Sequence, residues 1–325
     1  MQERSFGKTG WQVSEIGLGC WQLGGDFGPV SDATSTEILT TARAQGVNFW
    51  DTADVYGGGQ SESRIGAFAD KAGVKVVTKL GRGGDFEGMT RYTRERVRES
   101  LTGSAKRLGV KQIDLAQLHC IPVEVLKDGE IFVWMEDMKS EGLIEHWGAS
   151  IETIEQALIV LDAPGCASLQ TIFNLFRQDA VEKLFPVALD RQVAIIVRLP
   201  LASGLLSGKM TRDTTFAAQD HRGYNRDGAA FYVGETFSGL PYEKGVELAA
   251  ELQGFVPDGW TLADLALRWI LDQKAVTTII AGVTKADQLV ANCRASGLPP
   301  LSADLHAQLA DFYRTKVRPH VRGGI

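Results

Sequence analysis

Residues 75–119 read KVVTKLGRGGDFEGMTRYTRERVRESLTGSAKRLGVKQIDLAQLH, and this stretch contains the repeating unit of the fold. The apolar, β-branched run at 75–78 predicts a strand, the segment 93–108 has the periodicity of a helix, and 113–118 predicts a second strand. A helix between two strands is typical of parallel neighbours, because a parallel pair needs a crossover connection of this length. The stretch therefore predicts one βαβ unit.

The same alternation runs along the whole chain. Strands are predicted at residues 16–20, 47–50, 75–78, 113–118, 144–149, 168–173, 193–197 and 277–281. Helical segments are predicted at 32–45, 93–108, 123–141, 151–161, 179–190, 242–252, 262–273 and 285–295. Eight strands in alternation with helices predict an α/β protein that closes into a (β/α)8 TIM barrel, as one domain over residues 1–325. An open doubly wound sheet is the alternative, but Gly17-Leu18-Gly19-Cys20 does not continue into the Gly-x-Gly-x-x-Gly turn that such a sheet normally carries.

Two segments lie outside the eight units. Residues 4–6 and 12–14, turning at 8–10, predict an N-terminal β-hairpin that can plug one end of the barrel. Residues 211–241 form a long loop after the seventh strand, without clear periodicity. A loop of this length is usually functional or disordered, and its five aromatic residues favour one that covers something.

Composition excludes several classes of protein. The 325 residues are 44% hydrophobic and 23% charged, as in ordinary globular proteins, and the net charge of −6 argues against a nucleic-acid partner. The four cysteines are far apart and form neither a disulfide framework nor a metal-binding motif. Since the chain shows neither a secretory signal nor a run of about 20 apolar residues, we expect a cytoplasmic protein without a membrane partner. The sequence carries no signal for its oligomeric state.

Ionisable residues end three neighbouring strands. Asp51, Lys79 and His119 each close an apolar run, and in a closed barrel the carboxyl ends of the strands meet at one mouth. Buried charges cost several kcal/mol unless they are paired, so we expect Asp51 to pair with Lys79. Tyr56 follows Asp51 closely. The four residues together predict a catalytic site, although each taken singly is also explained by helix capping, an extended lysine or a hydrogen-bonded core histidine.

At this point the sequence resembles a known family. The segment Asp51-Thr52-Ala53-Asp54-Val55-Tyr56-Gly57-Gly58-Gly59-Gln60-Ser61-Glu62 is similar to the signature of the aldo-keto reductase superfamily. Later segments resemble further motifs of that family, in the family's order: 77–81, 115–119, 200–209 and 280–285. The resemblance implies a barrel enzyme that reduces aldehydes and ketones with NADPH and without a metal. It places the four catalytic positions at Asp51, Tyr56, Lys79 and His119.

Chemistry explains those residue types. As hydride reaches the carbonyl carbon, the oxygen gains negative charge and needs a proton, for which Tyr56 is the candidate general acid. The ordinary pKa of a phenol is near 10, and an ammonium at Lys79 is expected to lower it. Asp51 keeps Lys79 charged, and His119 is placed to hydrogen-bond the carbonyl oxygen.

The resemblance also implies cofactor contacts. Ser150 and Gln170 correspond to the carboxamide partners, although Ile151 stands where the next partner is often Asn. Arg198 replaces the aromatic that often stacks on the nicotinamide, and a guanidinium plane can also stack. The pyrophosphate is expected along Leu201, Ser203, Gly204 and Leu205.

At the adenosine end, the expected contacts are Gly282, Thr284, Lys285, Gln288 and Asn292. Thr284 and Lys285 open a helix, whose N-terminus suits the 2′-phosphate of NADPH. Gln288 occupies the position at which many members of the family have an arginine that binds this phosphate. We therefore expect NADP(H) to be favoured and NAD(H) to be possible.

Trp21 and Phe27 are expected to wall a pocket for a small aldehyde, ketone or sugar-type carbonyl substrate, and Arg198, Arg222 and Arg226 suggest a substrate with an anionic group. Cys120 follows His119 directly, but adjacent strand residues point to opposite faces, which disfavours a Cys–His pair. His146, His221, His306 and His320 have no clustered partners in the sequence and are set aside. Two other functions stay open. One is a Schiff-base aldolase that uses Lys79, and the other is a cofactor-binding regulatory protein like the channel-associated subunits of this fold.

Overall fold

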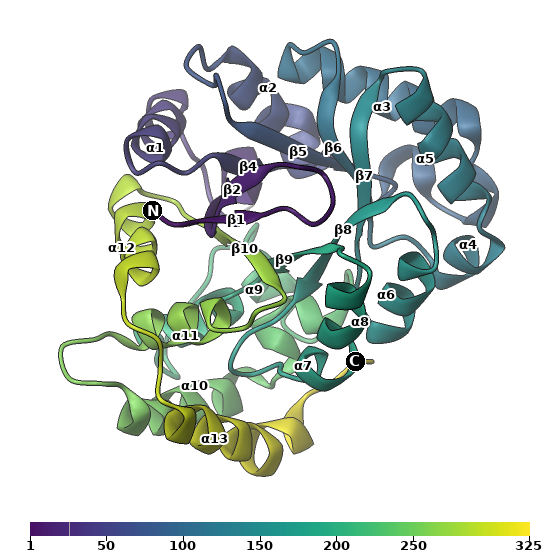
Figure 1. Ribbon diagram of the computed structural model, residues 1–325. Coiled ribbons are helices and arrows are strands. Elements are labelled where there is room, and N and C mark those ends of the chain that lie inside the picture. The colour runs from purple at the N-terminus through teal and green to yellow at the C-terminus, as the bar shows by residue number, and fades with distance from the viewer. Residues whose placement is uncertain (26) are drawn as a thin grey trace.

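In the computed structural model, which describes residues 1–25 and 27–325, eight parallel strands close into a barrel (Figure 1). Each strand pairs with the next along the chain, and the last pairs with the first. The barrel strands are β3 (Ile16–Gly19), β4 (Phe49–Asp51), β5 (Lys75–Leu80), β6 (Ile113–His119), β7 (Ile144–Ser150), β8 (Cys166–Ile172), β9 (Ala194–Arg198) and β10 (Val276–Gly282). The predicted (β/α)8 barrel is thereby confirmed.

Helices surround this barrel (Figure 1). They are α1 (Asp32–Ala44), α2 (Gln60–Ala67), α3 (Arg94–Leu108), α4 (Val123–Asp128), α5 (Glu130–Ser140), α6 (Ile154–Leu161), α7 (Ala180–Lys183), α8 (Phe185–Asp190), α9 (His221–Tyr224), α10 (Tyr242–Leu252), α11 (Leu262–Leu271), α12 (Ala286–Cys293) and α13 (Ala303–Phe312). Within the described part of the chain, no helix combines the length and the apolar character that crossing a membrane requires.

Several helix boundaries differ from the sequence-based expectation. The helix predicted at 123–141 is two helices, since Gly129 lies between α4 and α5 with a φ of 82° that ends the first of them. The helix predicted at 151–161 starts at Ile154, because Thr153 and Gln156 form a reciprocal capping box there. Helices α2 and α13 were not predicted from the sequence pattern.

Strand periodicity sorts the inward-facing residues into two layers. Lower in the barrel lie apolar residues such as Phe49 of β4 and Val77 of β5, which belong to one buried cluster. Two residues further along the same strands come Asp51 and Lys79, which face the same side because side chains alternate along a strand. The register pairs Asp51 directly with Val77 across the two strands. An apolar floor thus lies beneath a polar upper layer at the carboxyl ends of the strands.

The N-terminal hairpin packs against the underside of this apolar floor. Strands β1 (Glu3–Ser5) and β2 (Gln12–Ser14) pair antiparallel, and buried Phe6, Trp11 and Val13 pack in the same cluster as Phe49 and Val77. The predicted plug at one barrel end is therefore confirmed, and it closes the end opposite the polar layer.

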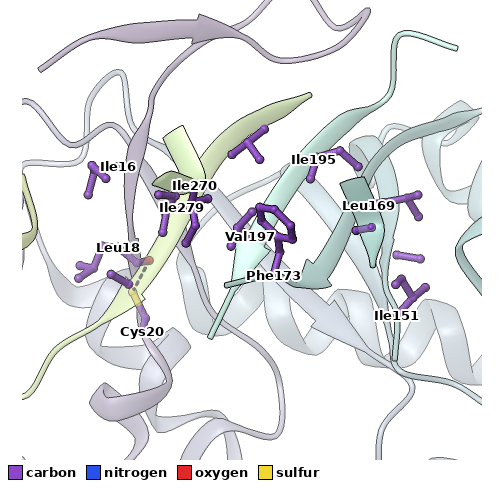
Figure 2. Close-up of a cluster of buried hydrophobic side chains, with 14 of the residues drawn as sticks. Ile16, Leu18, Cys20, Ile151, Leu169, Phe173, Ile195, Val197, Ile270 and Ile279 are labelled. Carbon is purple, nitrogen blue, oxygen red and sulfur yellow. Dashed lines mark hydrogen bonds between the residues drawn. The ribbon is translucent and has the colours of Figure 1, made fainter. Parts of the chain in front are cut away.

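A second and larger core lies between the barrel and its helices. Figure 2 shows Ile16 and Leu18 of β3 beside Ile279 of β10 and Val197 of β9, all buried. On β3 the alternating positions are glycines, and a Cβ on Gly17 would lie 2.9 Å from the carbonyl oxygen of Phe49. This strand therefore carries its large side chains on the outer face, because the inside of the barrel at Gly17 is already filled by neighbouring strands.

Candidate active site

One large cavity opens at the carboxyl ends of the strands. Its volume is about 750 Å³, and its walls include Asp51, Tyr56 and His119 at one end and Gln288 and Asn292 at the other. A cavity of this size falls within the range of small-molecule and cofactor sites.

Asp51 and Lys79 form a buried ion pair at the inner end of this cavity. The Lys79 ammonium donates to Asp51 Oδ1 and, at 2.8 Å, to the carbonyl oxygen of Thr52, while its side chain is fully buried. The other carboxylate oxygen of Asp51 accepts hydrogen bonds from Gln117 Nε2 at 3.1 Å and Gln170 Nε2 at 2.8 Å. The expected pair is present, and both carboxylate oxygens are hydrogen-bonded, which offsets the cost of burying the charges.

Tyr56 is held above this pair. Lys79 Nζ lies 3.3 Å from Tyr56 Oη, within hydrogen-bonding distance. The next residue, Gly57, has a φ of 57°, and a Cβ there would lie 2.2 Å from the carbonyl oxygen of Gly24. Only glycine fits such a close backbone approach, which fixes the loop that carries Tyr56 against the loop after β3. The ring of Trp21 stacks on Tyr56 with centroids 5.6 Å apart.

His119 ends β6 and completes the group. Its ring lies edge-on to Tyr56 at a centroid distance of 5.8 Å, and both residues line the cavity. Its Nδ1 is buried and has no hydrogen-bond partner among the described residues. Tyr56 and His119 therefore flank one space in which a carbonyl oxygen can sit.

Burial and neighbouring charges shift the pKa values of Lys79, His119 and Tyr56. Burial opposes a charge on Lys79, but Asp51 and Tyr56 raise the pKa of this amine above its ordinary value. Burial, Arg82 and Lys79 lower the pKa of His119 well below 6.5, so its imidazole is neutral near pH 7. Burial raises the pKa of Tyr56 by more than Lys79 lowers it. The expected lowering by Lys79 is present, but the net direction is upward, because the desolvation of the phenolate outweighs the nearby ammonium.

The residues expected at the nicotinamide lie beside this group. Gln170 lines the cavity, and its Oε1 accepts a hydrogen bond from Ser150 Oγ at 3.4 Å. Arg198 also lines the cavity at the end of β9, where its Nη2 donates to the carbonyl oxygen of Ile151 at 3.1 Å. This carbonyl fixes the guanidinium at the position where the family often has an aromatic ring.

The segment after β9 has an unusual backbone. Leu199, Ala202 and Ser203 have φ between 48° and 56°, in the left-handed region that side chains other than glycine rarely adopt. Strain of this kind clusters at ligand sites, and Leu199, Leu201, Ser203 and Gly204 line the cavity. Leu205 is buried behind them. Ser203 Oγ, however, contacts the backbone of Glu235 and Phe237, so the side chain holds the long loop rather than facing an open anion site.

At the far end, the predicted helix start is confirmed, since α12 follows Lys285 directly. Gly282, Thr284, Gln288 and Asn292 line the cavity, whereas the Lys285 side chain is exposed and does not contribute to its wall. Gln288 Oε1 accepts from the Thr284 N–H at 2.8 Å. Asp287 and Lys209, which the sequence did not single out, add one charge of each sign to this wall.

Aromatic residues form the outer wall. Trp21 and Phe27 line the cavity and meet edge-to-face at 5.0 Å, as expected for a substrate pocket. Tyr224 and Phe231 add further aromatic surface from the loop 211–241, which therefore covers the mouth as predicted. His221 of α9 is buried, and its ring centroid lies 4.7 Å from those of both Trp21 and Phe27. This histidine, to which the sequence assigned no role, therefore supports the aromatic wall.

Two charged residues at the mouth of the cavity were not predicted from the sequence. Arg82 follows β5, and Glu235 belongs to the long loop, 153 positions further along the chain. Arg82 Nη1 donates to Glu235 Oε1 at 2.9 Å, and Arg198 Nη1 lies 3.4 Å from the same oxygen. Burial acts to raise the pKa of Glu235, yet the two arginines hold it at about 2. The only signal in the sequence was the position of Arg82 three residues after Lys79.

Cys120 also lies at this mouth. Its Sγ is 3.6 Å from Glu235 Oε1 and 3.5 Å from Arg198 Nη2. Burial raises the pKa of this thiol to about 11. A thiol that stays protonated near pH 7 is a poor nucleophile, which agrees with setting it aside.

Comparisons with known proteins agree on one family. The model of the Aldo/keto reductase family matches residues 15–314. The chain is 30% identical to the aldo-keto reductase YhdN of Bacillus subtilis (strain 168), covering 91% of this chain and 89% of that protein. It is 31% identical to a probable voltage-gated potassium channel subunit beta of Oryza sativa subsp. japonica, covering 93% of each.

Solved structures agree on the fold. The glycerol dehydrogenase AKR11B4 of Gluconobacter oxydans superposes with a TM-score of 0.76 and 29% identity, covering 97% of this chain and 94% of that one. The holo form of the aldo-keto reductase AKR11C1 of Bacillus halodurans gives a TM-score of 0.77 at 24% identity, with 96% of each chain covered.

Proposed function

The chain belongs to the aldo/keto reductase family, and from this premise we propose that it reduces aldehyde or ketone carbonyls to alcohols with a nicotinamide dinucleotide. The observation that carries the proposal is the arrangement of the Asp51–Lys79 pair beneath Tyr56, with His119 flanking the same space. A bound dinucleotide supplies the hydride in this chemistry.

The protein supplies position and a proton. His119 is neutral, so it can donate one ring N–H to the carbonyl oxygen and align it. Tyr56 donates its proton to that oxygen as negative charge develops there. Lys79, kept charged by Asp51, favours the phenolate that remains, so the proton transfer becomes easier as the reaction proceeds.

The cavity fits a dinucleotide. It extends from the catalytic group past the segment 199–204 to the start of α12, and its walls combine backbone turns with a few polar side chains. We propose that Ser150, Gln170 and Arg198 hold the nicotinamide and that the segment 201–205 follows the pyrophosphate.

We propose NADP(H) as the favoured cofactor and expect only a small preference over NAD(H). Thr284, Lys285 and Lys209 can approach a 2′-phosphate. Asp287 opposes such a phosphate by its charge, and Gln288 Oε1 already accepts the Thr284 N–H. Titrating the apo-protein with NADPH and with NADH, followed by quenching of tryptophan fluorescence, measures this preference directly.

A regulatory role is the second candidate, because one relative is named as a probable channel subunit. The intact catalytic group favours the enzyme. A Schiff-base aldolase is disfavoured, since its lysine must be neutral to attack a carbonyl, whereas Asp51 keeps Lys79 protonated.

Tyr56→Phe separates these functions. The variant keeps the ring that stacks on Trp21 and loses the proton, so we expect unchanged cofactor binding and a loss of carbonyl reduction of at least about 100-fold. A variant with near-native reductase activity would exclude Tyr56 as the acid. Tight cofactor binding by the native protein without turnover across a broad panel of carbonyl compounds would support the regulatory role instead.

A further inference from the structure

We propose that the substrate carries an anionic group, a carboxylate or a phosphate, and that Arg82 binds it beside the catalytic group. This inference rests on the proposed carbonyl reductase function and names the substrate class of that same site.

The first observation is the location of Arg82. It lines the cavity together with Tyr56, His119 and Phe231, and its guanidinium stacks over the Phe231 ring at 5.0 Å. Among charged groups, Arg82 has the largest effect on the pKa of His119. The guanidinium therefore lies close to the space in which the carbonyl group reacts, in contact with an aromatic ring.

The second observation is the balance of charge. At this end of the cavity, Lys79 is matched by Asp51, and Arg222 is matched by Asp220, whose carboxylate binds its guanidinium at 2.6 Å. Arg82 and Arg198, in contrast, share the single carboxylate of Glu235. Glu152, which does not line the cavity, adds a second carboxylate beside this cluster and acts on Arg198. Among the described residues that line this end of the cavity, Arg82 and Arg198 thus face a single carboxylate.

The third observation is the number of unused donors. A guanidinium carries five N–H donors in a planar fork that matches a carboxylate or a phosphate. Within residues 1–25 and 27–325, the hydrogen bond found for the Arg82 side chain is the one to Glu235. The remaining donors of the Arg82 fork are therefore not used within that part of the chain and can bind an anion in the cavity.

The structure also corrects the expectation about the other arginines. Arg226 does not line the cavity and lies over the Tyr242 ring at 4.7 Å, so it is not placed to bind a substrate. Arg222 lines the cavity but is neutralised by Asp220. Of the three arginines named from the sequence, Arg198 alone belongs to the cluster around Glu235, and Arg82 replaces the other two.

The test compares matched pairs of neutral and anionic aldehydes with the native enzyme and saturating cofactor. Benzaldehyde and 4-carboxybenzaldehyde test a carboxylate, and D-glyceraldehyde and D-glyceraldehyde 3-phosphate test a phosphate. We expect kcat/KM to be at least about 10-fold higher for the anionic member of one pair, which also identifies the anion. A ratio near one in both pairs would overturn the inference while leaving the reductase function in place. Absence of turnover for all four aldehydes would instead refute the proposed function itself.

Arg82→Gln identifies the residue. We expect it to lower the ratio of kcat/KM between the favoured anionic aldehyde and its neutral counterpart by about 10-fold or more. Equal losses for both members would show that Arg82 acts on the reacting oxygen and would overturn the assignment. Arg212→Gln is the matched control, since it removes one positive charge from an exposed position on the long loop. This control should leave the ratio of kcat/KM between the anionic and the neutral aldehyde unchanged in both pairs.

Cofactor titration shows whether the variant is folded. If Arg82→Gln does not bind the cofactor, Arg82→Lys takes its place, because it keeps a positive charge facing Glu235 but loses the planar fork. The preference for the anionic member should then fall several-fold, and an unchanged preference would overturn the role of the Arg82 fork.

Discussion

Replacing Asp51 by Asn tests the buried ion pair beneath the active site. The substitution preserves shape but removes the negative charge that faces the fully buried Lys79 ammonium. It also turns one of the two acceptor oxygens into an NH2 group, which then faces either the Lys79 ammonium or the amides of Gln117 and Gln170. Removing one partner of a buried pair costs about 3–5 kcal/mol, so we expect the free energy of unfolding to fall by that amount at pH 7.

The loss should depend on pH. In the native protein Asp51 raises the pKa of Lys79, so this lysine is protonated in both the folded and the unfolded chain from pH 7 to 9.5. It therefore does not make the free energy of unfolding depend on pH in this range. In the variant, burial acts without Asp51 and lowers the pKa of Lys79 below its unfolded value of about 10.4. Between those two values the unfolded chain binds more protons, so stability rises with pH by up to about 1.4 kcal/mol per unit.

Urea unfolding followed by tryptophan fluorescence at pH 7 and 9.5 measures both effects. Asp114→Asn is the matched control, because Asp114 pairs with Lys75 at 2.9 Å on the barrel surface and both side chains are about 30% exposed. We expect the control to lose at most about 1 kcal/mol. If Asp51→Asn lost no more than this control, or lost the same amount at both pH values, the assignment of Lys79 as a buried ammonium held by Asp51 would be wrong.

Three further predictions follow from the geometry. The kcat for carbonyl reduction should be constant between pH 6 and 9. Raised pKa values keep Tyr56 and Lys79 protonated over this range, and a lowered pKa keeps His119 neutral. A steep fall of kcat within this range would contradict these pKa shifts. Gly66→Ala should lower the free energy of unfolding by about 1–3 kcal/mol, since its Cβ would lie 2.0 Å from a carbonyl oxygen of α3; a thermal or urea melt that matches the native protein would refute this packing. Gln288→Arg should strengthen NADPH binding relative to NADH by about 10-fold or more in a fluorescence titration, and an unchanged ratio would place the 2′-phosphate elsewhere.

The clustering of the proposed catalytic group was predictable because three of its residues end consecutive strands. Asp51, Lys79 and His119 each interrupt an apolar run, and barrel topology brings such positions to one mouth without any knowledge of side-chain contacts. Their pairing follows from the cost of burying single charges. The net direction of the Tyr56 pKa did not follow, because it depends on how deeply the phenol is buried relative to the strength of the Lys79 contact.

The helices, too, were only partly predictable from the sequence. Periodicity located α3 and α11, whose apolar residues recur on one face, while α2 was missed because its eight residues include three polar ones at buried or partly buried positions. One of them, Glu62, is buried because Thr78 and Arg107 hydrogen-bond its carboxylate. A charge that is buried only through distant partners does not look like a core residue in the sequence.

By itself, the sequence determined the barrel, the hairpin plug and the residues of the proposed catalytic group, since these depend on local periodicity and on which residues end the strands. The tertiary structure decided what surrounds that group. Glu235 reaches Arg82 and Arg198 only because a long loop folds back over the mouth, and no local pattern records where such a loop lands. The surroundings of Arg82, and with them the expected anionic substrate, depend on contacts between segments far apart in the chain.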